Sequence, residues 1–259
     1  MGPPMTDNAR TDPECAALSN KDILTLWETG EHRHDVDKAL LIAAAFDPGL
    51  GWDELARLPL GRRDSLIIRL RERMFGDRIP IAVQCPNCRE RLEFDTSASE
   101  LLSCCPPNDS PTDIAFDLAG YHIVARPLNS LDLANLRPDM SRAAARQALV
   151  CETVVHASLD GATVAPAELP AQAVTALAEK LVEVDPAADL HFALSCPDCR
   201  RAWVATFDIT AYFWRELSAI ARTMLEDVHQ LATAYGWRED EILGLSTARR
   251  AFYLSRINP

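Results

Sequence analysis

Two short stretches of this chain are near-copies of each other, and they constrain the fold more than any other feature. The first covers residues 79–95 and the second covers residues 190–208. In each, a run of alternating apolar residues leads into a Cys-Pro-x-Cys turn, a basic residue follows, and a second alternating run ends in Phe-Asp. Alternation on both sides of a proline-containing turn predicts two strands joined at a tight tip. We therefore expect two β-hairpins with cysteines at their tips.

The two turns together carry four cysteines: Cys85, Cys88, Cys196 and Cys199. Four thiolates are the ligand set of a closed, tetrahedral zinc site. We therefore predict one structural zinc ion held by these four side chains. Residues 89–195 separate the two pairs, which is far more than a compact zinc finger uses. The pattern thus indicates a zinc ribbon whose halves are separated by an inserted subdomain.

Other interpretations of the cysteine pairs remain open. In a thiol oxidoreductase, a Cys-x-x-Cys pair opens a helix whose N-terminus lowers the thiol pKa, whereas here a strand-like run follows each pair. The cysteines could also remain without metal. A disulfide framework is not expected, because residues 1–14 lack the basic and apolar parts of a secretion signal and disulfides form mainly in oxidising compartments.

Charge bears on a third alternative, a zinc-ribbon regulator that binds nucleic acid. The formal net charge is −12 and the isoelectric point is near 4.9, whereas binding to nucleic acid requires a basic surface. We therefore expect no nucleic-acid partner. No apolar run approaches the ~20 residues of a membrane-spanning helix, so no membrane span is expected either.

Motifs for catalysis are missing from the sequence. It contains no Gly-x-Ser-x-Gly, no His-Glu-x-x-His and no glycine-rich phosphate loop. A zinc ion with four cysteine ligands also has no open position for water or substrate. We therefore expect a protein that is not an enzyme and that has no small-molecule substrate.

The remaining patterns predict an α+β protein that is mainly helical and is built around the split four-cysteine zinc ribbon, with an inserted α/β subdomain. The expected parts are a disordered tail over 1–18, a helical segment over 19–78, the two ribbon halves over 79–103 and 190–208, an inserted hairpin-plus-helices subdomain over 104–189, and C-terminal helices over 209–259.

Local signals place individual helix ends. Ser19 and Ser130 are expected to be N-caps, and Gly236 is expected to end the long helix after residue 208 in a left-handed conformation. A further helix is predicted from Ser141 to His156, with Cys151 as a small core residue.

Six arginines form the dense basic zone of this acidic chain: Arg62, Arg63, Arg69, Arg71, Arg73 and Arg78. This zone is interpreted either as a solvated face or as a docking surface for an acidic partner. Cys104 and Cys105 precede two prolines and are expected to be loop thiols, because adjacent cysteines do not easily bind one ion together.

Several motifs combine into a family pattern. They are Leu60-Gly-Arg-Arg-Asp64, Met74-Phe-Gly-Asp-Arg78, the two Cys-Pro-x-Cys turns, Phe207-Asp-Ile209 before a long helix, and a tail from Ala234 to Ser246 that contains Tyr-Gly-Trp. With these residues the chain resembles, over about residues 20–257, the T4-type baseplate or hub-assembly proteins of contractile phage tails and of the related extracellular contractile injection systems.

The resemblance implies a non-enzymatic protein that acts in baseplate assembly and is made in the bacterial cytoplasm. Its partners would be other baseplate and tail proteins. Zinc ligation carries over to Cys85, Cys88, Cys196 and Cys199, and no other acting residue can be transferred. The resemblance leaves open whether the protein stays in the tail-like particle or acts transiently during its assembly.

Overall fold

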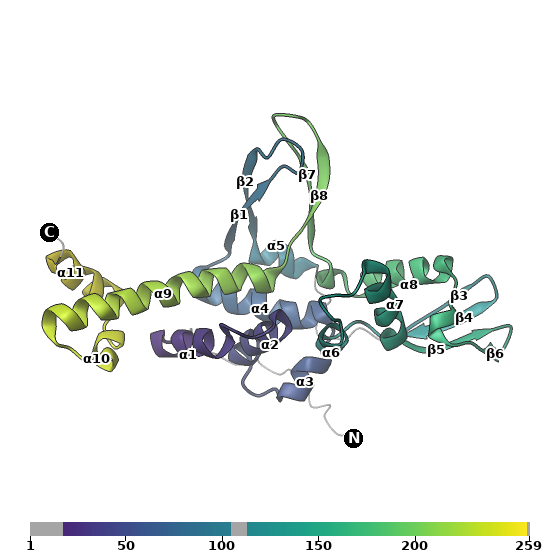
Figure 1. The fold of residues 1–259 in the computed structure, drawn as a ribbon, viewed down its shortest axis with the longest axis horizontal. Coiled ribbons are helices and arrows are strands. Elements are labelled where there is room, and N and C mark those ends of the chain that lie inside the picture. Colours follow the sequence, from purple (N-terminus) through teal and green to yellow (C-terminus); the bar gives the residue numbers. More distant parts are fainter. Residues whose placement is uncertain (1–17, 105–112, 258–259) are drawn as a thin grey trace, which may run out of the picture.

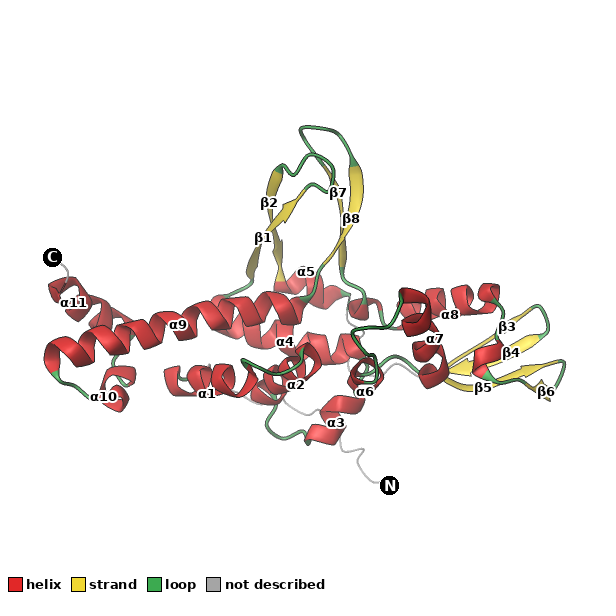
Figure 2. Ribbon diagram, viewed as in Figure 1, coloured by secondary structure: helices red, strands yellow, loops and turns green. Residues whose placement is uncertain are grey.

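The computed structural model describes residues 18–104 and 113–257 of the chain. A helical body lies at the centre, a pair of β-hairpins stands up from it, and a smaller α/β insert extends from one end (Figure 1). Among the described residues, strands occur only in the hairpins and the insert (Figure 2), so the α+β class is confirmed. The expected disorder of residues 1–17 and the loop position of Cys105 lie outside the described residues.

Six helices make up most of the body. They are α1 (Asn20–Gly30), α2 (Asp35–Phe46), α3 (Trp52–Arg57), α4 (Leu60–Phe75), α5 (Ala98–Ser103) and α9 (Ile209–Tyr235). Ser19 caps α1 as expected, in a capping box with Asp22. The apolar faces of these helices converge on one core, in which Ile67 of α4 and Phe213 and Leu217 of α9 are fully buried.

The long helix α9 continues past the body and carries two short helices at its far end (Figure 1). These are α10 (Glu239–Leu243) and α11 (Thr247–Ile257). Gly236 ends α9 with φ +69°, so its predicted left-handed conformation is confirmed. There Tyr235, Trp237 and Tyr253 pack their rings against one another, with Tyr235 and Trp237 stacked at 4.8 Å between centroids.

Two antiparallel hairpins form the upright pair, which we call the hairpin pair. Its strands are β1 (Arg78–Gln84) with β2 (Arg91–Ser97), and β7 (His191–Ser195) with β8 (Ala202–Thr206). The helical body fixes the position of both hairpin bases, because β1 directly follows α4 and β8 leads directly into α9. Both hairpins occur where the alternating pattern predicts them.

The insert connects β2 and α5 to β7. A four-stranded sheet of order β3-β4-β5-β6 forms one layer, and helices α7 and α8 cover it (Figure 1). The bounds are β3 (Ile114–Leu118), β4 (Tyr121–Ala125), α6 (Ser130–Ala134), α7 (Arg142–Thr153), β5 (Val154–Leu159), β6 (Ala162–Thr163), η1 (Pro166–Glu168), α8 (Ala171–Val184) and η2 (Pro186–Ala188). A second buried cluster, which includes Ile123, Ala157 and Leu177, gives the insert a core of its own.

Three predictions in the insert are wrong. The helix that starts after Ser141 ends at Thr153, and Val154–Leu159 is a strand because it pairs with β4 and places β-branched residues on the sheet. Cys151 is exposed on α7 and is not a core residue. Asn129, not Ser130, caps α6, because its side chain accepts the N–H groups of residues 131 and 132.

The insert returns to the body through a close contact between η2 and α4. The N–H of Gly61 donates to Asp185 Oδ2 at 3.0 Å, and Asp185 is buried. A Cβ atom at residue 61 would overlap the Asp185 carboxylate and would lie 2.9 Å from the backbone nitrogen of Ala188. Glycine is therefore required here for the two segments to approach.

Gly61→Ala is expected to destabilise the protein by about 1–3 kcal/mol, since the packed η2 backbone must shift. Urea denaturation measures this loss. The control is Gly51→Ala, where an added Cβ meets no atom within 4 Å and the cost at a helix N-cap is below about 1 kcal/mol. Equal losses in the two variants would contradict the close-approach explanation.

Candidate metal centre

The hairpin pair alternates strictly between exposed and covered residues. In β1, Ile79 and Ile81 are buried while their neighbours are exposed, and β7 and β8 show the same period of two. Phe94 of β2 packs edge-on against Phe192 of β7 at 5.1 Å between ring centroids. This contact, below the tips, holds the two hairpins against each other.

Both tips have the same backbone geometry. In the first, Cys85 N–H donates to the carbonyl of Glu90 at 2.9 Å and Arg89 N–H donates to the carbonyl of Cys85 at 3.0 Å. In the second, the corresponding bonds from Cys196 and Arg200 have the same lengths. The two Cys-Pro-x-Cys-Arg turns have therefore adopted the same backbone hydrogen bonding.

Each tip contains an arginine with positive φ: 64° at Arg89 and 58° at Arg200. A left-handed conformation costs an L-residue roughly 1–2 kcal/mol, and a β-branched side chain tolerates it least. The turn holds these residues in that conformation through the carbonyl of the first cysteine.

Arg89→Val is expected to destabilise the protein by about 1–2 kcal/mol more than Arg89→Gly does, because only glycine adopts positive φ freely. Both variants lose the same charge, so each controls for the other. Thermal unfolding in the presence of zinc measures the difference. Identical melting temperatures would show that the backbone conformation of the tip does not contribute to stability.

The tips bring the four predicted cysteines together. The Sγ atoms of Cys85 and Cys199 are 3.6 Å apart, and those of Cys88 and Cys196 are 3.5 Å apart. All four sulfurs lie within 4.8 Å of one another. Both of these short distances join one hairpin to the other, so the cluster connects segments that are more than 100 residues apart in sequence.

These distances fit a single tetrahedral ion. Four sulfurs at about 2.3 Å from a zinc ion are about 3.8 Å from one another, which is close to the spacing between the tips. The donor set also fits, because thiolates bind soft or borderline metals such as zinc. Cys85 and Cys196 are buried, while Cys88 and Cys199 lie nearer the surface.

Hydrogen bonds to the sulfurs favour their charged form. The Asn87 side chain, on the first tip, and the N–H of Arg201, on the second, lower the pKa of Cys199 to about 6. The N–H groups of Cys88 and Asn87 lower the pKa of Cys85. Such bonds are those expected around thiolate ligands.

The remaining thiol of the first tip behaves differently. The N–H of Glu90 lowers the pKa of Cys88, but burial and the neighbouring sulfurs outweigh it and raise the pKa to about 12. Sulfurs this close cannot all ionise without a cation between them. A bound metal ion would supply that positive charge.

Other predicted residues lie away from the cluster. Cys104 is exposed at the end of α5, and Cys151 is exposed in the insert. The tip arginines Arg89 and Arg200 are exposed. Within the described residues, the four tip cysteines form the one group of three or more potential metal ligands.

Two of the six arginines of the basic zone belong to neither a solvated face nor a docking surface, whereas Arg73 and Arg78 are exposed and Arg62 and Arg69 are partly exposed. Arg63 and Arg71 are buried. Arg63 contacts Asp64 at 2.7 Å and donates to Ser130 Oγ at 2.9 Å. Because these guanidinium groups bind inside the protein, they are available neither to solvent nor to a partner.

Arg71 ties three segments together beneath the hairpin pair. It makes two contacts with the carboxylate of Glu216 on α9, at 3.1 and 3.2 Å. It also donates to the carbonyls of Gly76 and Arg78, at 2.7 and 2.6 Å. The sequence shows no sign of this network, because its partners are a distant glutamate and two backbone carbonyls.

The fold and the cysteine cluster define an α+β protein whose helical body carries two hairpins with closely spaced tips, an arrangement suited to a structural role. The model of one protein family, described as T4 bacteriophage base plate protein, matches residues 40–214. The match covers most of the chain and includes both hairpins, and the protein belongs to this family. The resemblance seen in the sequence is thereby confirmed.

Searches of curated proteins and of solved structures gave no match. Family membership supports a structural role in a phage base plate, with other tail proteins as partners. It also suggests a non-enzymatic role. Among the described helices, none has the length and apolar character needed to cross a membrane.

Proposed function

We propose that this protein is a non-enzymatic structural or assembly component of the baseplate of a contractile, phage tail-like injection system, and that one structural zinc ion stabilises it. The observation that carries the proposal is the convergence of four sulfurs from two distant hairpins in a member of the base plate family. The proposed ligands are Cys85, Cys88, Cys196 and Cys199. The protein would be made in the bacterial cytoplasm before it joins other tail proteins.

The zinc ion would stabilise the protein by linking two hairpins that are far apart in the chain. The insert leaves the body after the first hairpin and returns just before the second. A metal bond between the tips closes this long loop, and binding to the folded state alone adds to folding stability. The hairpins and the insert would then present fixed surfaces to neighbouring subunits.

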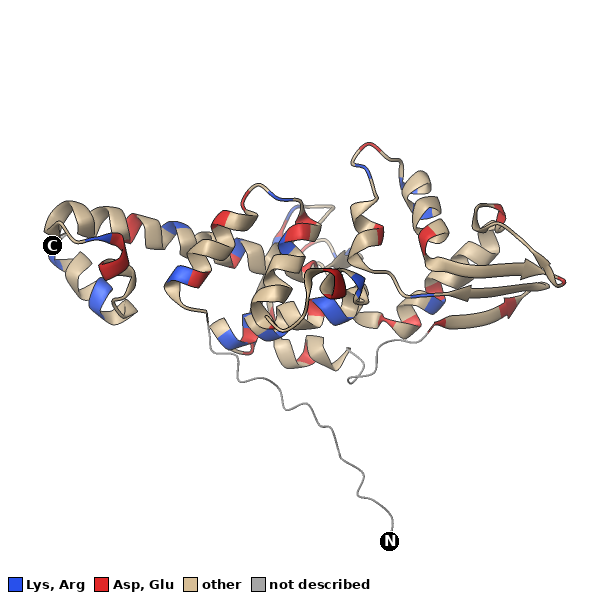
Figure 3. Cartoon of the chain, turned by 90° about the horizontal axis from the view of Figure 1, so that it is seen from below, with Lys and Arg blue, Asp and Glu red and all other residues tan. Residues whose placement is uncertain are grey.

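Two functions compete with this proposal. A zinc-ribbon regulator of nucleic acid is disfavoured by the net charge of −12 and by the mixture of acidic and basic side chains along the molecule (Figure 3). A thiol oxidoreductase is disfavoured because a strand, not a helix, follows each cysteine pair.

Deletion of the gene in the producing bacterium tests the proposal. Electron microscopy should show particles without complete baseplates, and expression of the tagged protein should restore them and isolate other tail proteins. The control variant Cys151→Ser should restore assembly equally well, because Cys151 lies outside the cluster. Normal contractile particles in the deletion strain would contradict the proposal. A salt-sensitive shift of DNA, or metal-free thiols that react rapidly, would support the competing functions.

A further inference from the structure

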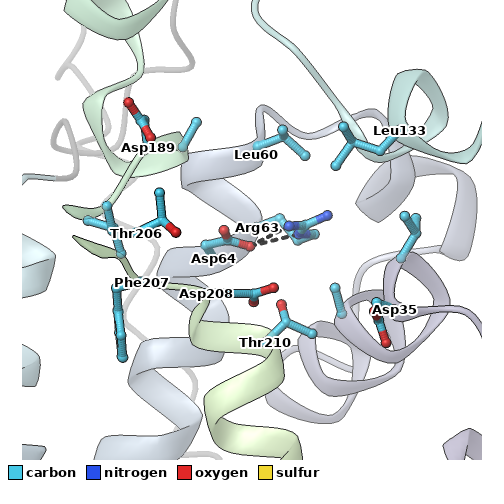
Figure 4. A pocket seen from close by; sticks show the side chains of 14 residues that line it. Asp35, Leu60, Arg63, Asp64, Leu133, Asp189, Thr206, Phe207, Asp208 and Thr210 are labelled. Atoms are coloured by element: carbon cyan, nitrogen blue, oxygen red, sulfur yellow. Dashed lines mark hydrogen bonds and ion pairs between the residues drawn. The ribbon is translucent and has the colours of Figure 1, made fainter. Parts of the chain in front are cut away.

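A pocket lies at the base of the second hairpin, where several parts of the fold meet. Its lining comes from α2, the start of α4, α6, the segment that leads from the insert into β7, and the start of α9 (Figure 4). Its volume is about 260 Å³, slightly below the ~300–1,000 Å³ typical of small-molecule sites. The size suits one long side chain better than a metabolite.

The lining is strongly acidic. It contains four aspartates, Asp35, Asp64, Asp189 and Asp208, and a single basic residue, Arg63. The Arg63 guanidinium is already paired with Asp64, at 2.7 Å. Asp35 is likewise paired, with Lys38 at 3.2 Å, so Asp189 and Asp208 are the carboxylates that give the pocket a negative potential.

Burial makes negative charge in this pocket costly. Desolvation raises the pKa of Asp64 in spite of Arg63, and the carboxylates of Asp208 and Asp185 raise it further. Asp185 is buried and close enough to Asp64 to affect its pKa, and its Oδ1 has no hydrogen-bond partner among the described residues. A cation in the pocket would relieve this excess of negative charge.

A second, independent feature points to a ligand. Thr210, at the start of α9, is only 5% exposed, and its hydroxyl makes no hydrogen bond to the described part of the chain. In Figure 4 this hydroxyl is directed toward the interior of the pocket, beside the Asp208 carboxylate. This hydroxyl is therefore free to donate a hydrogen bond to, or accept one from, a group in the pocket.

The rest of the lining is apolar and includes Leu60, Leu133, Leu190 and Phe207. Arginine and lysine combine an apolar stem with a cationic head, so their chemistry matches apolar walls with acidic groups. A bare metal ion matches less well, because the pocket aspartates do not form a group of three close ligand atoms among the described residues.

We propose that this pocket is a docking site for a basic side chain, arginine or lysine, of a partner protein. The stem lies against the leucines, and the cationic head binds Asp208, Asp64 and the Thr210 hydroxyl. That the partner is another tail protein rests on the proposed function, whereas the binding of a basic side chain does not. The occupant would contact body, insert and second hairpin at once.

Titration of the full-length, isotope-labelled protein tests the site, with backbone NMR signals as the readout. The probes are blocked single residues: N-acetyl-arginine N-methylamide, the lysine and norleucine equivalents, and magnesium chloride. The arginine or lysine probe should cause saturable shifts at residues 60–64 and 206–210, and norleucine should not. Equal shifts with norleucine, shifts confined to magnesium, or no saturable shift at these residues would overturn the proposal.

Two variants sharpen the test. Asp208→Asn keeps an oxygen that can cap α9 but removes the charge, and it should weaken binding of the basic probe about five- to tenfold. Thr210→Val removes only the hydroxyl and should also weaken binding. The control Asp240→Asn, on the distant helix α10, should bind like the parent. Unchanged binding in Thr210→Val and in a folded Asp208→Asn would show that the pocket does not bind the basic side chain. The proposed assembly role would be unaffected by that result.

Discussion

Cys85→Ser and Cys196→Ser are each expected to abolish stoichiometric zinc binding and to lower the melting temperature by on the order of 10 °C. Each removed thiol is buried at a hairpin tip, and its sulfur lies within 4.8 Å of the other three sulfurs. Ligand binding to the folded state contributes about 4 kcal/mol when the free ligand is at roughly 1,000 times its dissociation constant. A loss of that size in a chain of this length corresponds to the stated shift.

Metal analysis and thermal unfolding of the same samples provide the readout. Cys151→Ser is the matched control, because it makes the same chemical change at an exposed thiol outside the cluster, and it should retain both zinc and stability. A chelator should lower the stability of the parent and of this control but should have little effect on Cys85→Ser. If either tip variant had the same zinc content and melting temperature as the parent, the proposal that the four cysteines bind a stabilising zinc ion would be contradicted.

Arg71→Met is expected to cost about 2–3 kcal/mol, less than the ~3–5 kcal/mol lost on breaking a fully buried ion pair, because the Glu216 side chain is 25% exposed. The change leaves the Glu216 carboxylate and the carbonyls of Gly76 and Arg78 without their donor. Because Arg71 joins α4 to both α9 and the start of β1, the loss should also loosen the base of the first hairpin. Urea denaturation measures the free energy of unfolding.

Arg69→Met is the control, since Arg69 lies on the same helix and remains partly exposed; its cost should stay within about 0.5 kcal/mol. The double variant Arg71→Met/Glu216→Gln should recover part of the loss, because it no longer leaves a charge without its partner. A single Arg71→Met variant as stable as the parent would show that the network contributes nothing to the fold.

The hairpins and their cysteines could be predicted from sequence because their signals are local. Alternation, proline and the cysteine spacing define each tip within about ten residues, and the near-identity of the two copies indicated a shared site. The caps at Ser19 and Gly236 were predictable for the same reason: each depends on a few neighbouring residues.

Features that depend on tertiary contacts could not be predicted in this way. Residues 154–156 continue a helical pattern in sequence but belong to the strand Val154–Leu159, which pairs with β4. The burial of Arg63 and Arg71 could not be predicted, because in sequence they look like surface arginines. Their partners, Ser130 and Glu216, are distant in the chain. The acidic pocket likewise combines aspartates from four separate segments.

The central claim is that two distant hairpin tips hold one metal ion, and X-ray absorption at the zinc edge of the purified protein tests it most directly. The account predicts one zinc ion per chain with four sulfur neighbours at about 2.3 Å. Absence of zinc from protein purified without chelator, or a zinc shell dominated by nitrogen or oxygen, would contradict it.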